Sequence, residues 1–379
     1  MQPLSGLKIL DFSTLLPGPY ATMLMADMGA DVLRVESPSR PDLVREMPPK
    51  VAGQSAAFQY LNRGKRSIGL NLKHASALEI INELVKTFDI VVEQFRPGVM
   101  ARLGLGYEQL RAINPRLVYC SITGYGQSGP YRDRAGHDIN YLALSGISGS
   151  SGRQNELALN SVQIADVAAG SQPAVMAILA AVIQRQSTGE GQYIDIAMSD
   201  QCLALQPLMM PGVLNGEPSI SPEGHFLNGS GLYDYYETAD GRYMAVGSLE
   251  PQFRQQLVDV IGHPEWFDKS DAEIKPAIKA VFMSQPQDYW IDKFSQVDAC
   301  VEPVLTMAEA AEMPHARQRR MVVDIEGGKQ VRPAPLLKGM SAASLSKAPL
   351  CGEDTQNVLK TLGYSQKEVD AFAQEGVFS

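Results

Sequence analysis

The first half of the chain alternates between short apolar runs, typical of buried strands, and segments with apolar residues at helical spacing. The predicted strands are residues 7–12, 31–36, 89–95, 117–123 and 193–198, and the predicted helices are residues 20–28, 75–88, 107–113 and 175–184. Strands that alternate with helices form a parallel sheet covered on both faces. The sequence therefore predicts an α/β fold. Its first strand-to-helix turn, residues 15–19, is not a GxGxxG motif, so the NAD fingerprint is absent.

The pattern changes after residue 202. Residues 203–231 carry scattered Pro, Gly and Ser and are predicted to form a linker. Strand-like residues on both sides of Asp240-Gly241 predict a hairpin, and three helical patterns follow it. Residues 232–312 are therefore predicted to form a smaller α+β domain. In the last segment, residues 313–379, we expect a hairpin within 322–331 and closing helices at 354–362 and 366–375.

Composition narrows the classes of protein that this chain can be. A length of 379 residues predicts two or three domains, and a net charge of −9 argues against bulk binding of nucleic acid. An anionic ligand would need a local basic patch. The four cysteines are far apart and form no CxxC pair, which favours reduced thiols over disulfides or a zinc site. The chain begins without a signal-peptide pattern and has no run of about 18 apolar residues, so we expect a cytoplasmic protein without membrane contacts.

Several polar residues are predicted to share one edge of the sheet, because ligands of open parallel sheets bind at the carboxyl ends of the strands. These residues are Ser13, Thr14, Glu36, Ser37, Arg96 and the glycine-rich segment 123–127. The basic loop 62–67 adjoins this edge and contributes Arg63, Lys65 and Arg66. A solvated loop and a phosphate site are both compatible with such a run of cations.

The segment 134–171 carries the chemically most informative pattern. It opens with Gly136-His137-Asp138, passes through a Gly- and Ser-rich loop, and ends with Asp166 before an apolar helix. A His and an Asp at the two ends of a loop could face each other across a small substrate, where one removes a proton and the other returns one. Two structural roles are the alternatives: a His–Asp hydrogen-bond pair, and Asp166 as the N-cap of the following helix.

The chain resembles the CaiB/BaiF family, also called the family III CoA-transferases, and within it the α-methylacyl-CoA racemases. The likeness covers almost the entire chain. The family motifs are Pro3–Leu7, Gly29–Val32, Asn62–Ser67, Arg96-Pro97-Gly98 with Leu103-Gly104-Leu105, and Gly124–Gln127; the racemase-like motifs are Gly136–Tyr141, Ala239–Tyr243 and Leu249–Phe253.

This resemblance implies an architecture. Members form an interlocked homodimer, in which each chain threads through a ring made by the other. A Rossmann-like large domain would combine residues 1–202 with the C-terminal part of 313–379, and a small α+β domain would be carried on two linkers. The active site would lie between one chain's large domain and its partner's small domain.

The resemblance also implies roles for individual residues. His137 and Asp166 match the two racemase bases, and Glu250, supplied by the partner chain's small domain, matches the carboxylate that supports the His. Asp138 and Tyr233 match positions that line the same site. Coenzyme A would be part of the substrate, with no separate cofactor and no metal. Its predicted contacts are Arg63, Lys65, Arg66, Arg96, Gly124, Tyr125 and Gly126. Racemases commonly carry a cation at the position of Ser37.

Three functions remain open on the sequence. The first is a 2-methylacyl-CoA racemase that moves the α-proton through an enolate, which a donor at the N-terminus of the helix after Asp166 would stabilise. The second is a CoA-transferase, in which the residue matching Asp166 is the nucleophile that forms an acyl anhydride and then an aspartyl-CoA thioester. The third is an acyl-CoA-binding protein without activity.

Overall fold

The computed structural model describes residues 2–154, 156–332, 337 and 345–378, and the chain divides into two compact units. The large unit comprises residues 1–145, 161–205 and 319–379, and the small unit comprises residues 146–160 and 206–318. The chain leaves the large unit at Leu205 and returns at Arg319. Residues 146–160 belong to the small unit, which the sequence did not indicate.

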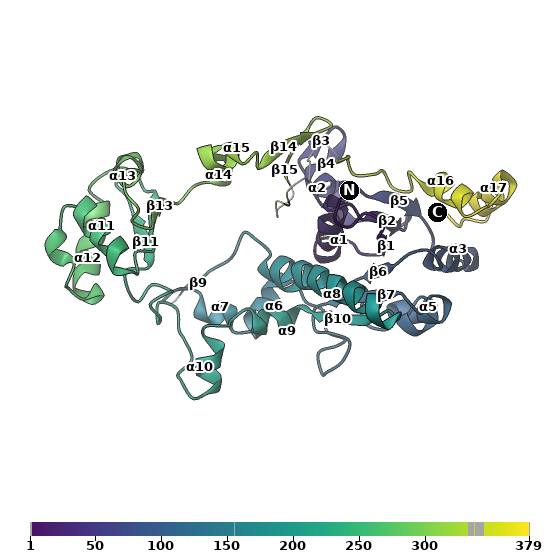
Figure 1. Ribbon diagram of the computed structural model, residues 1–379, viewed down its shortest axis with the longest axis horizontal. Coiled ribbons are helices and arrows are strands. Elements are labelled where there is room, and N and C mark those ends of the chain that lie inside the picture. Colours follow the sequence, from purple (N-terminus) through teal and green to yellow (C-terminus); the bar gives the residue numbers. More distant parts are fainter. Residues whose placement is uncertain (1, 155, 333–336, 338–344, 379) are drawn as a thin grey trace. The chain divides into compact units, whose positions relative to one another are not determined.

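A six-stranded parallel sheet forms the centre of the large unit, as predicted (Figure 1). Its strands in spatial order are β10 (Tyr193–Ala197), β7 (Val118–Thr123), β6 (Ile90–Glu93), β1 (Lys8–Asp11), β2 (Asp31–Glu36) and β5 (Arg66–Gly69). All five pairings are parallel, so the carboxyl ends of the strands share one edge. Strand β5 was not predicted: the expected loop 62–67 consists of the last residue of a helix, a turn and the start of this strand.

Helices cover both faces of this sheet. The large-unit helices are α1 (Pro17–Asp27), α2 (Ala56–Asn62), α3 (Ala75–Val85), α4 (Val99–Arg102), α5 (Tyr107–Ile113), α6 (Asp138–Leu144), α8 (Gln172–Thr188), α9 (Met198–Ala204), α16 (Thr355–Thr361) and α17 (Gln366–Gln374), with a 3-10 turn at Leu43–Glu46 and a π-helical turn at Ala165–Ser171. One face packs Leu10, Leu33 and Val91 against α3, α5, α16 and α17. Helices α1 and α8 pack against strands of the same sheet. Two short hairpins complete the unit, β3 (Lys50–Val51) with β4 (Gln54–Ser55) and β14 (Val322–Ile325) with β15 (Gly328–Val331).

Helix α8 continues the π-helical turn without a break and is buried on one face only. Its buried residues, Ala174, Ile178, Ala181 and Arg185, recur at helical spacing, whereas Met176 and Ile183 are 68% and 67% exposed. The apolar composition of this helix therefore does not mean that all of it is buried: its outer face is exposed in this chain. By length and composition, residues 165–188 could cross a membrane, a test that core helices also pass, and in this fold the helix packs against β7 and β10.

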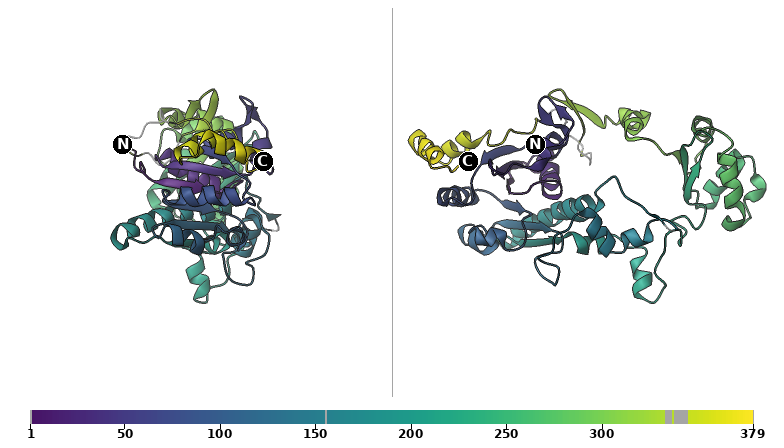
Figure 2. Two further views of the ribbon diagram at one scale, coloured as in Figure 1. Left: turned by 90° about the vertical axis from the view of Figure 1, so that its right-hand side faces the viewer. Right: turned by 180° about the vertical axis from the view of Figure 1, so that it is seen from behind.

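The small unit is built around a three-stranded antiparallel sheet. Its strands are β11 (Asp234–Glu237), β12 (Tyr243–Val246) and β13 (Val301–Pro303), and the predicted turn at Asp240-Gly241 joins the first two. Its helices and short elements are α7 (Ile147–Ser150), β8 (Gly152–Arg153), β9 (Glu156–Leu157), α10 (Met210–Leu214), α11 (Pro251–Val260), η3 (Pro264–Trp266), α12 (Asp271–Phe282), α13 (Gln287–Phe294), α14 (Met307–Glu312) and α15 (Pro314–Gln318). Figure 2 shows both units from further directions.

One ion-pair cluster fastens the inserted segment 146–160 to the rest of the small unit. Arg153 contacts Asp234 (Nη2 to Oδ1, 2.6 Å) and Glu223 (Nη1 to Oε1, 2.8 Å). Lys275 contacts the second oxygen of Asp234 at 2.7 Å. Because Asp234 is buried and accepts two cations, it anchors the segment to strand β11.

Candidate active site

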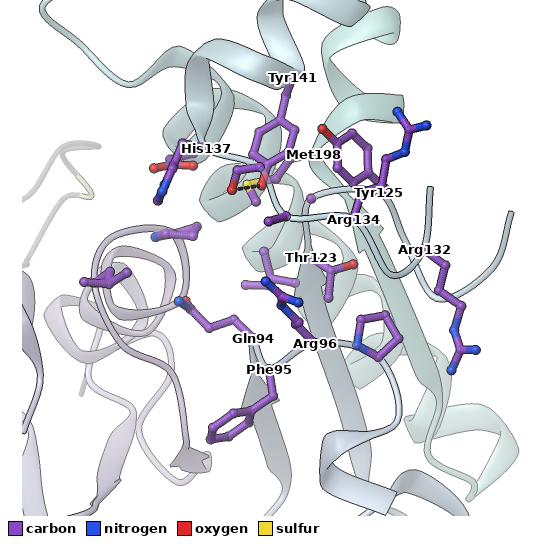
Figure 3. Close-up of a pocket in the computed structure, with 18 residues that line it drawn as sticks. Gln94, Phe95, Arg96, Thr123, Tyr125, Arg132, Arg134, His137, Tyr141 and Met198 are labelled. Atoms are coloured by element: carbon purple, nitrogen blue, oxygen red, sulfur yellow. Dashed lines mark hydrogen bonds between the residues drawn. The ribbon is translucent and has the colours of Figure 1, made fainter. Parts of the chain in front are cut away.

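A cavity of about 290 Å³ opens at the carboxyl ends of β6 and β7 (Figure 3). The residues that follow β6 are Gln94, Phe95 and Arg96, and Thr123 ends β7. Its other walls come from the loop that precedes α6 and from the π-helical turn. We call this space the central cavity, and its lining is Leu15, Pro17, Gln94–Pro97, Ile122–Tyr125, Arg132, Arg134–His137, Tyr141, Asp166 and Met198.

The structure brings His137 and Asp166 to the central cavity, although 28 residues separate them in the sequence. His137 is exposed, and its backbone N–H donates to Asn140 Oδ1 at 3.0 Å, which fixes the start of α6. The buried Tyr141 donates from its hydroxyl to the Gly136 carbonyl at 2.7 Å. A Cβ at Gly136 would lie 2.7 Å from the Tyr141 ring, so this close approach requires glycine. The loop that carries His137 is therefore held in place by packing and hydrogen bonds.

Asp138 connects the two ends of the predicted site. Its Oδ1 accepts from the backbone N–H groups of Ala165 (2.6 Å) and Asp166 (3.1 Å). Asp138 thus caps the helical segment that carries Asp166, and the alternative that Asp166 is itself the cap was wrong. The Val167 N–H donates to the Gln163 carbonyl. The backbone donors of residues 165–167 are therefore engaged, which argues against our prediction that this turn offers an enolate a direct hydrogen bond.

Asp166 has the electrostatic properties of a proton-transfer group. It is half-buried in a π-helical turn, an irregularity that is frequent at functional sites. Its pKa is raised to about 6: burial is the largest cause, the charge on Asp138 acts in the same direction, and His137 opposes the shift. A carboxyl group with this pKa exchanges protons near neutral pH, so Asp166 can act as an acid or as a base.

A second, larger cavity lies along the same edge of the sheet, at the carboxyl ends of β1 and β2. This outer cavity has a volume of about 680 Å³ and includes the predicted edge residues Thr14, Glu36 and Ser37. Leu72, Phe95, Val99 and Leu103 form apolar walls. Three exposed cations line it, Arg40, Lys73 and Arg96, and no salt bridge joins them to a carboxylate in the described parts of the chain. Arg96 lines both the central and the outer cavity.

The basic loop, by contrast, uses its charges inside the fold. Arg63 is fully buried and forms a two-pronged pair with Asp27 (2.9 and 2.6 Å). Lys65 is buried against Asp11 at 3.1 Å, where burial lowers its pKa to about 8. Arg66 pairs with Asp31 on the surface at 2.8 Å. None of these three lines the central or the outer cavity, so their placement does not support the prediction that they bind phosphate.

Of the remaining predicted contacts of coenzyme A, three line the central cavity and one, Gly126, does not. Gly124 and Tyr125 line the central cavity together with Arg96. Gly126 lies behind them with φ at 80°, where its N–H donates to Thr123 Oγ1 and a Cβ would lie 3.1 Å from that of Ala197. Its role is therefore to shape the turn.

Sequence reasoning placed Arg96 at the sheet edge but missed the other exposed cations that the structure brings to the two cavities. Arg40 and Lys73 each follow a strand, β2 and β5, by four residues. Arg132 and Arg134 line the central cavity from the loop before His137. Had β5 been recognised as a strand, the rule that ligands bind at the carboxyl ends of strands would have pointed to Lys73.

The two predicted site residues of the small unit are described within that unit. Tyr233 is 41% exposed and lines a cavity of about 710 Å³ formed by small-unit residues. Glu250 is exposed and directly precedes α11. The proximity of Glu250 or Tyr233 to His137 stays a prediction.

The large unit thus combines an α/β fold with two adjoining cavities, one lined by His137 and Asp166 and the other by exposed cations. The family model for CoA-transferase family III matches residues 4–355, and the chain belongs to this family. It is 37% identical to the human alpha-methylacyl-CoA racemase, with 97% of this chain and 95% of the relative covered. It is 32% identical to the human succinyl-CoA:glutarate CoA-transferase, with 100% and 90% covered. The crystal structure of a CaiB/BaiF family protein from Brucella suis matches with a TM-score of 0.84 and 30% identity, covering 95% of this chain and 99% of that one. The resemblance to this family is thereby confirmed, and the chain is an acyl-CoA enzyme.

The cations of the outer cavity give a testable prediction about coenzyme A. Lys73→Ala is expected to raise the Kd for coenzyme A about 10-fold and to make binding less sensitive to salt, because a free ammonium at the cavity contributes a screened charge interaction. Arg66→Ala is the matched control: it removes a surface cation that is paired with Asp31, and we expect no change in Kd. Isothermal titration calorimetry at two salt concentrations measures both. Loss of affinity in Arg66→Ala alone would reassign the phosphate contact to the basic loop.

Proposed function

We propose that this protein is a 2-methylacyl-CoA racemase that transfers the α-proton between His137 and Asp166. The observation that carries the proposal is the placement of these two groups at one cavity, with the Asp166 pKa raised to about 6. Arg96 lines this cavity and the neighbouring cationic one, so a ligand that spans both would place its phosphates near Arg40, Lys73 and Arg96 and its thioester near the acid–base pair. Coenzyme A is part of the substrate in this proposal, and no separate cofactor is required.

The proposed reaction has two proton transfers. In one direction, neutral His137 removes the α-proton, the electron pair of the C–H bond forms an enolate with the thioester carbonyl, and protonated Asp166 delivers a proton to the opposite face. In the reverse direction, ionised Asp166 is the base and protonated His137 is the acid. Both states hold a single proton on the pair, so each turnover leaves the enzyme ready for the opposite enantiomer. The dipole of the helical segment 165–188 favours negative charge at its N-terminal end, where Asp166 lies.

The alternative is a CoA-transferase in which Asp166 is a nucleophile. Relatives named as transferases favour it, among them the acetyl-CoA:oxalate CoA-transferase of Acetobacter aceti, 33% identical over 86% of this chain. A transferase must bind a second carboxylic acid. The exposed Arg132 and Arg134 at the central cavity would suit such an anion.

Hydrogen exchange without an acceptor acid separates the two functions. Incubated with one enantiomer of a 2-methylacyl-CoA in deuterated buffer, a racemase is expected to incorporate one deuterium at the α-carbon and to scramble the stereocentre. Mass spectrometry and chiral chromatography of the released acid measure the two changes. If neither occurs, but an added carboxylic acid yields a new acyl-CoA, and hydroxylamine traps Asp166 during turnover, the transferase function is correct.

The pH dependence of racemisation is expected to be bell-shaped, with its acid limb near pH 6. Below its pKa of about 6, Asp166 is protonated and cannot remove the α-proton, so kcat/KM falls for the enantiomer that needs Asp166 as the base. At high pH the pair loses its last proton and the acid is missing. Initial rates from pH 5 to 9 check this. An activity that keeps rising with falling pH below 6 would contradict the role of Asp166.

The interlocked homodimer, with Glu250 of one chain supporting His137 of the other, belongs to this proposal. A cytoplasmic location without contacts to membrane or nucleic acid also remains part of the proposal.

A further inference from the structure

The turn that follows strand β6 forms part of every cavity described above in the large unit. It consists of Gln94, Phe95, Arg96 and Pro97, and we call it the β6 turn. Gln94 faces the central cavity, Phe95 lines the central and the outer cavity, and Arg96 also lines a third cavity of about 300 Å³ behind the turn. Figure 3 shows Gln94, Phe95 and Arg96 fanning out from the end of one strand. The conformation of this short turn therefore determines the direction of the Arg96 side chain, which lines all three cavities.

Few contacts orient the turn. The Gln94 side-chain oxygen accepts from the Gly18 N–H at 3.0 Å, and the Val99 N–H donates to the Arg96 carbonyl at 3.1 Å. The Arg96 side chain is exposed and forms no salt bridge with the described residues. Its direction therefore depends on the backbone of the turn.

Glu93 supplies the central contact. It is the last residue of β6, only 4% exposed, and its Oε2 accepts from the Phe95 N–H at 2.8 Å. The hydroxyl of Ser121, its neighbour on β7, also bonds to the carboxyl group. A buried carboxylate normally pairs with a cation, and no described cation forms a salt bridge with Glu93. Its position and its bond to Phe95 instead make the carboxylate a fixed acceptor for the β6 turn.

We infer that Glu93 is a positioning residue for acyl-CoA binding, which holds the β6 turn so that Arg96 and Phe95 meet the coenzyme A part of the substrate. This inference rests on the proposed use of the two cavities by an acyl-CoA, and it holds for a racemase and for a transferase alike. A charge-assisted hydrogen bond is about twice as strong as a neutral one, so the ionised form of Glu93 holds the turn more firmly than the protonated form.

The surroundings of Glu93 set the pH at which its hydrogen bond with the Phe95 N–H weakens. Burial raises the pKa of Glu93 to about 7, and the bonds from Ser121 and Phe95 oppose the shift. The charge on Asp195 of β10 raises it as well. The other titratable or charged groups around this carboxyl and the third cavity are Tyr119 and Cys120 of β7, Tyr193 of β10, Tyr107 and Glu108 of α5, and Arg96 of the turn itself. As the pH falls through about 7, Glu93 gains a proton and the contact to Phe95 loses its charge assistance.

The experiment is calorimetric binding of free coenzyme A to wild type, Glu93→Ala, Glu93→Gln and Tyr193→Phe between pH 6 and 8.5. At pH 8, Glu93→Ala is expected to raise Kd at least about 10-fold, as the loss of a hydrogen bond to a charged group predicts. Glu93→Gln keeps an oxygen acceptor for Phe95 without the charge, so its Kd should be about 3-fold above wild type at pH 8 and equal to it at pH 6. Tyr193→Phe removes a hydroxyl beside the same cavity, 3.2 Å from Ser121, and should bind like wild type.

The decisive result is that the Kd values of wild type and Glu93→Gln, measured as a function of pH, become equal at low pH. The 3′-phosphate of coenzyme A and the carboxyl of Asp166 also titrate in this range, but they do so in both proteins, so the difference between the curves isolates Glu93. Curves that stay parallel from pH 6 to 8.5, or a Glu93→Ala protein that binds like wild type, would overturn the inference. Wild type that binds no coenzyme A would instead overturn the proposed function, and the inference with it.

Discussion

Replacing either base with asparagine is expected to abolish racemisation while leaving each variant able to exchange the α-proton of one enantiomer. His137→Asn retains Asp166, which can still remove the proton that faces it and return deuterium to the same face. Asp166→Asn retains His137, which serves the other enantiomer. Racemisation needs both groups and should fall about 10³-fold, within the range for loss of a general acid or base.

The measurement uses each pure enantiomer in deuterated buffer, with mass spectrometry for exchange and chiral chromatography for inversion. Asp133→Asn is the control, because Asp133 is an exposed acid in the same loop that does not line the central cavity. It should keep wild-type rates. If the His137→Asn variant still exchanges the α-proton of both enantiomers, His137 is not a base. If Asp166→Asn loses all exchange and acyl transfer to an added acid as well, the nucleophilic role of Asp166 gains support.

Removing Arg63 is expected to lower the free energy of unfolding by about 3–5 kcal/mol without changing the Kd for coenzyme A. The guanidinium is fully buried and pairs with Asp27, which is itself 4% exposed. Arg63→Ala leaves that carboxylate buried and without its cation. Burial already raises the pKa of Asp27, and only the contacts with Arg63 and the charge on Lys65 oppose this. Because Arg63 lines neither the central nor the outer cavity, the folded variant should bind coenzyme A normally.

Urea denaturation measures the stability, and calorimetry under native conditions measures Kd. The double variant Arg63→Met with Asp27→Leu should recover most of the loss, since replacing both partners of a buried pair by apolar residues is often neutral. Arg66→Ala, which removes a surface pair about 40% exposed on both sides, should cost no more than about 1 kcal/mol. A stable Arg63→Ala protein with weakened coenzyme A binding would restore the phosphate role that the sequence suggested for Arg63.

The types and order of the main elements followed from the sequence. Strand β2 and helix α5 have the predicted bounds, and the hairpin at Asp240-Gly241 formed as expected. These features depend on residues that are close along the chain: the period of the apolar side chains decides strand or helix, and an Asp-Gly pair favours a tight turn. The resemblance to the family likewise singled out His137 and Asp166, which the fold brings to one cavity.

Tertiary structure alone decided which charges are free and which carboxylates hold the site together. Arg63 looked like a ligand for phosphate until the fold placed Asp27, 36 residues earlier, against it. Asp138, not Asp166, caps the helix, because it reaches an N-terminus 27 residues away. Strand β5 exists through its pairing with β2, and that pairing is what brings Lys73 to the ligand edge. A local pattern records whether a side chain prefers water or a core, but the partner of a buried charge comes from a distant segment, so only the folded chain determines it.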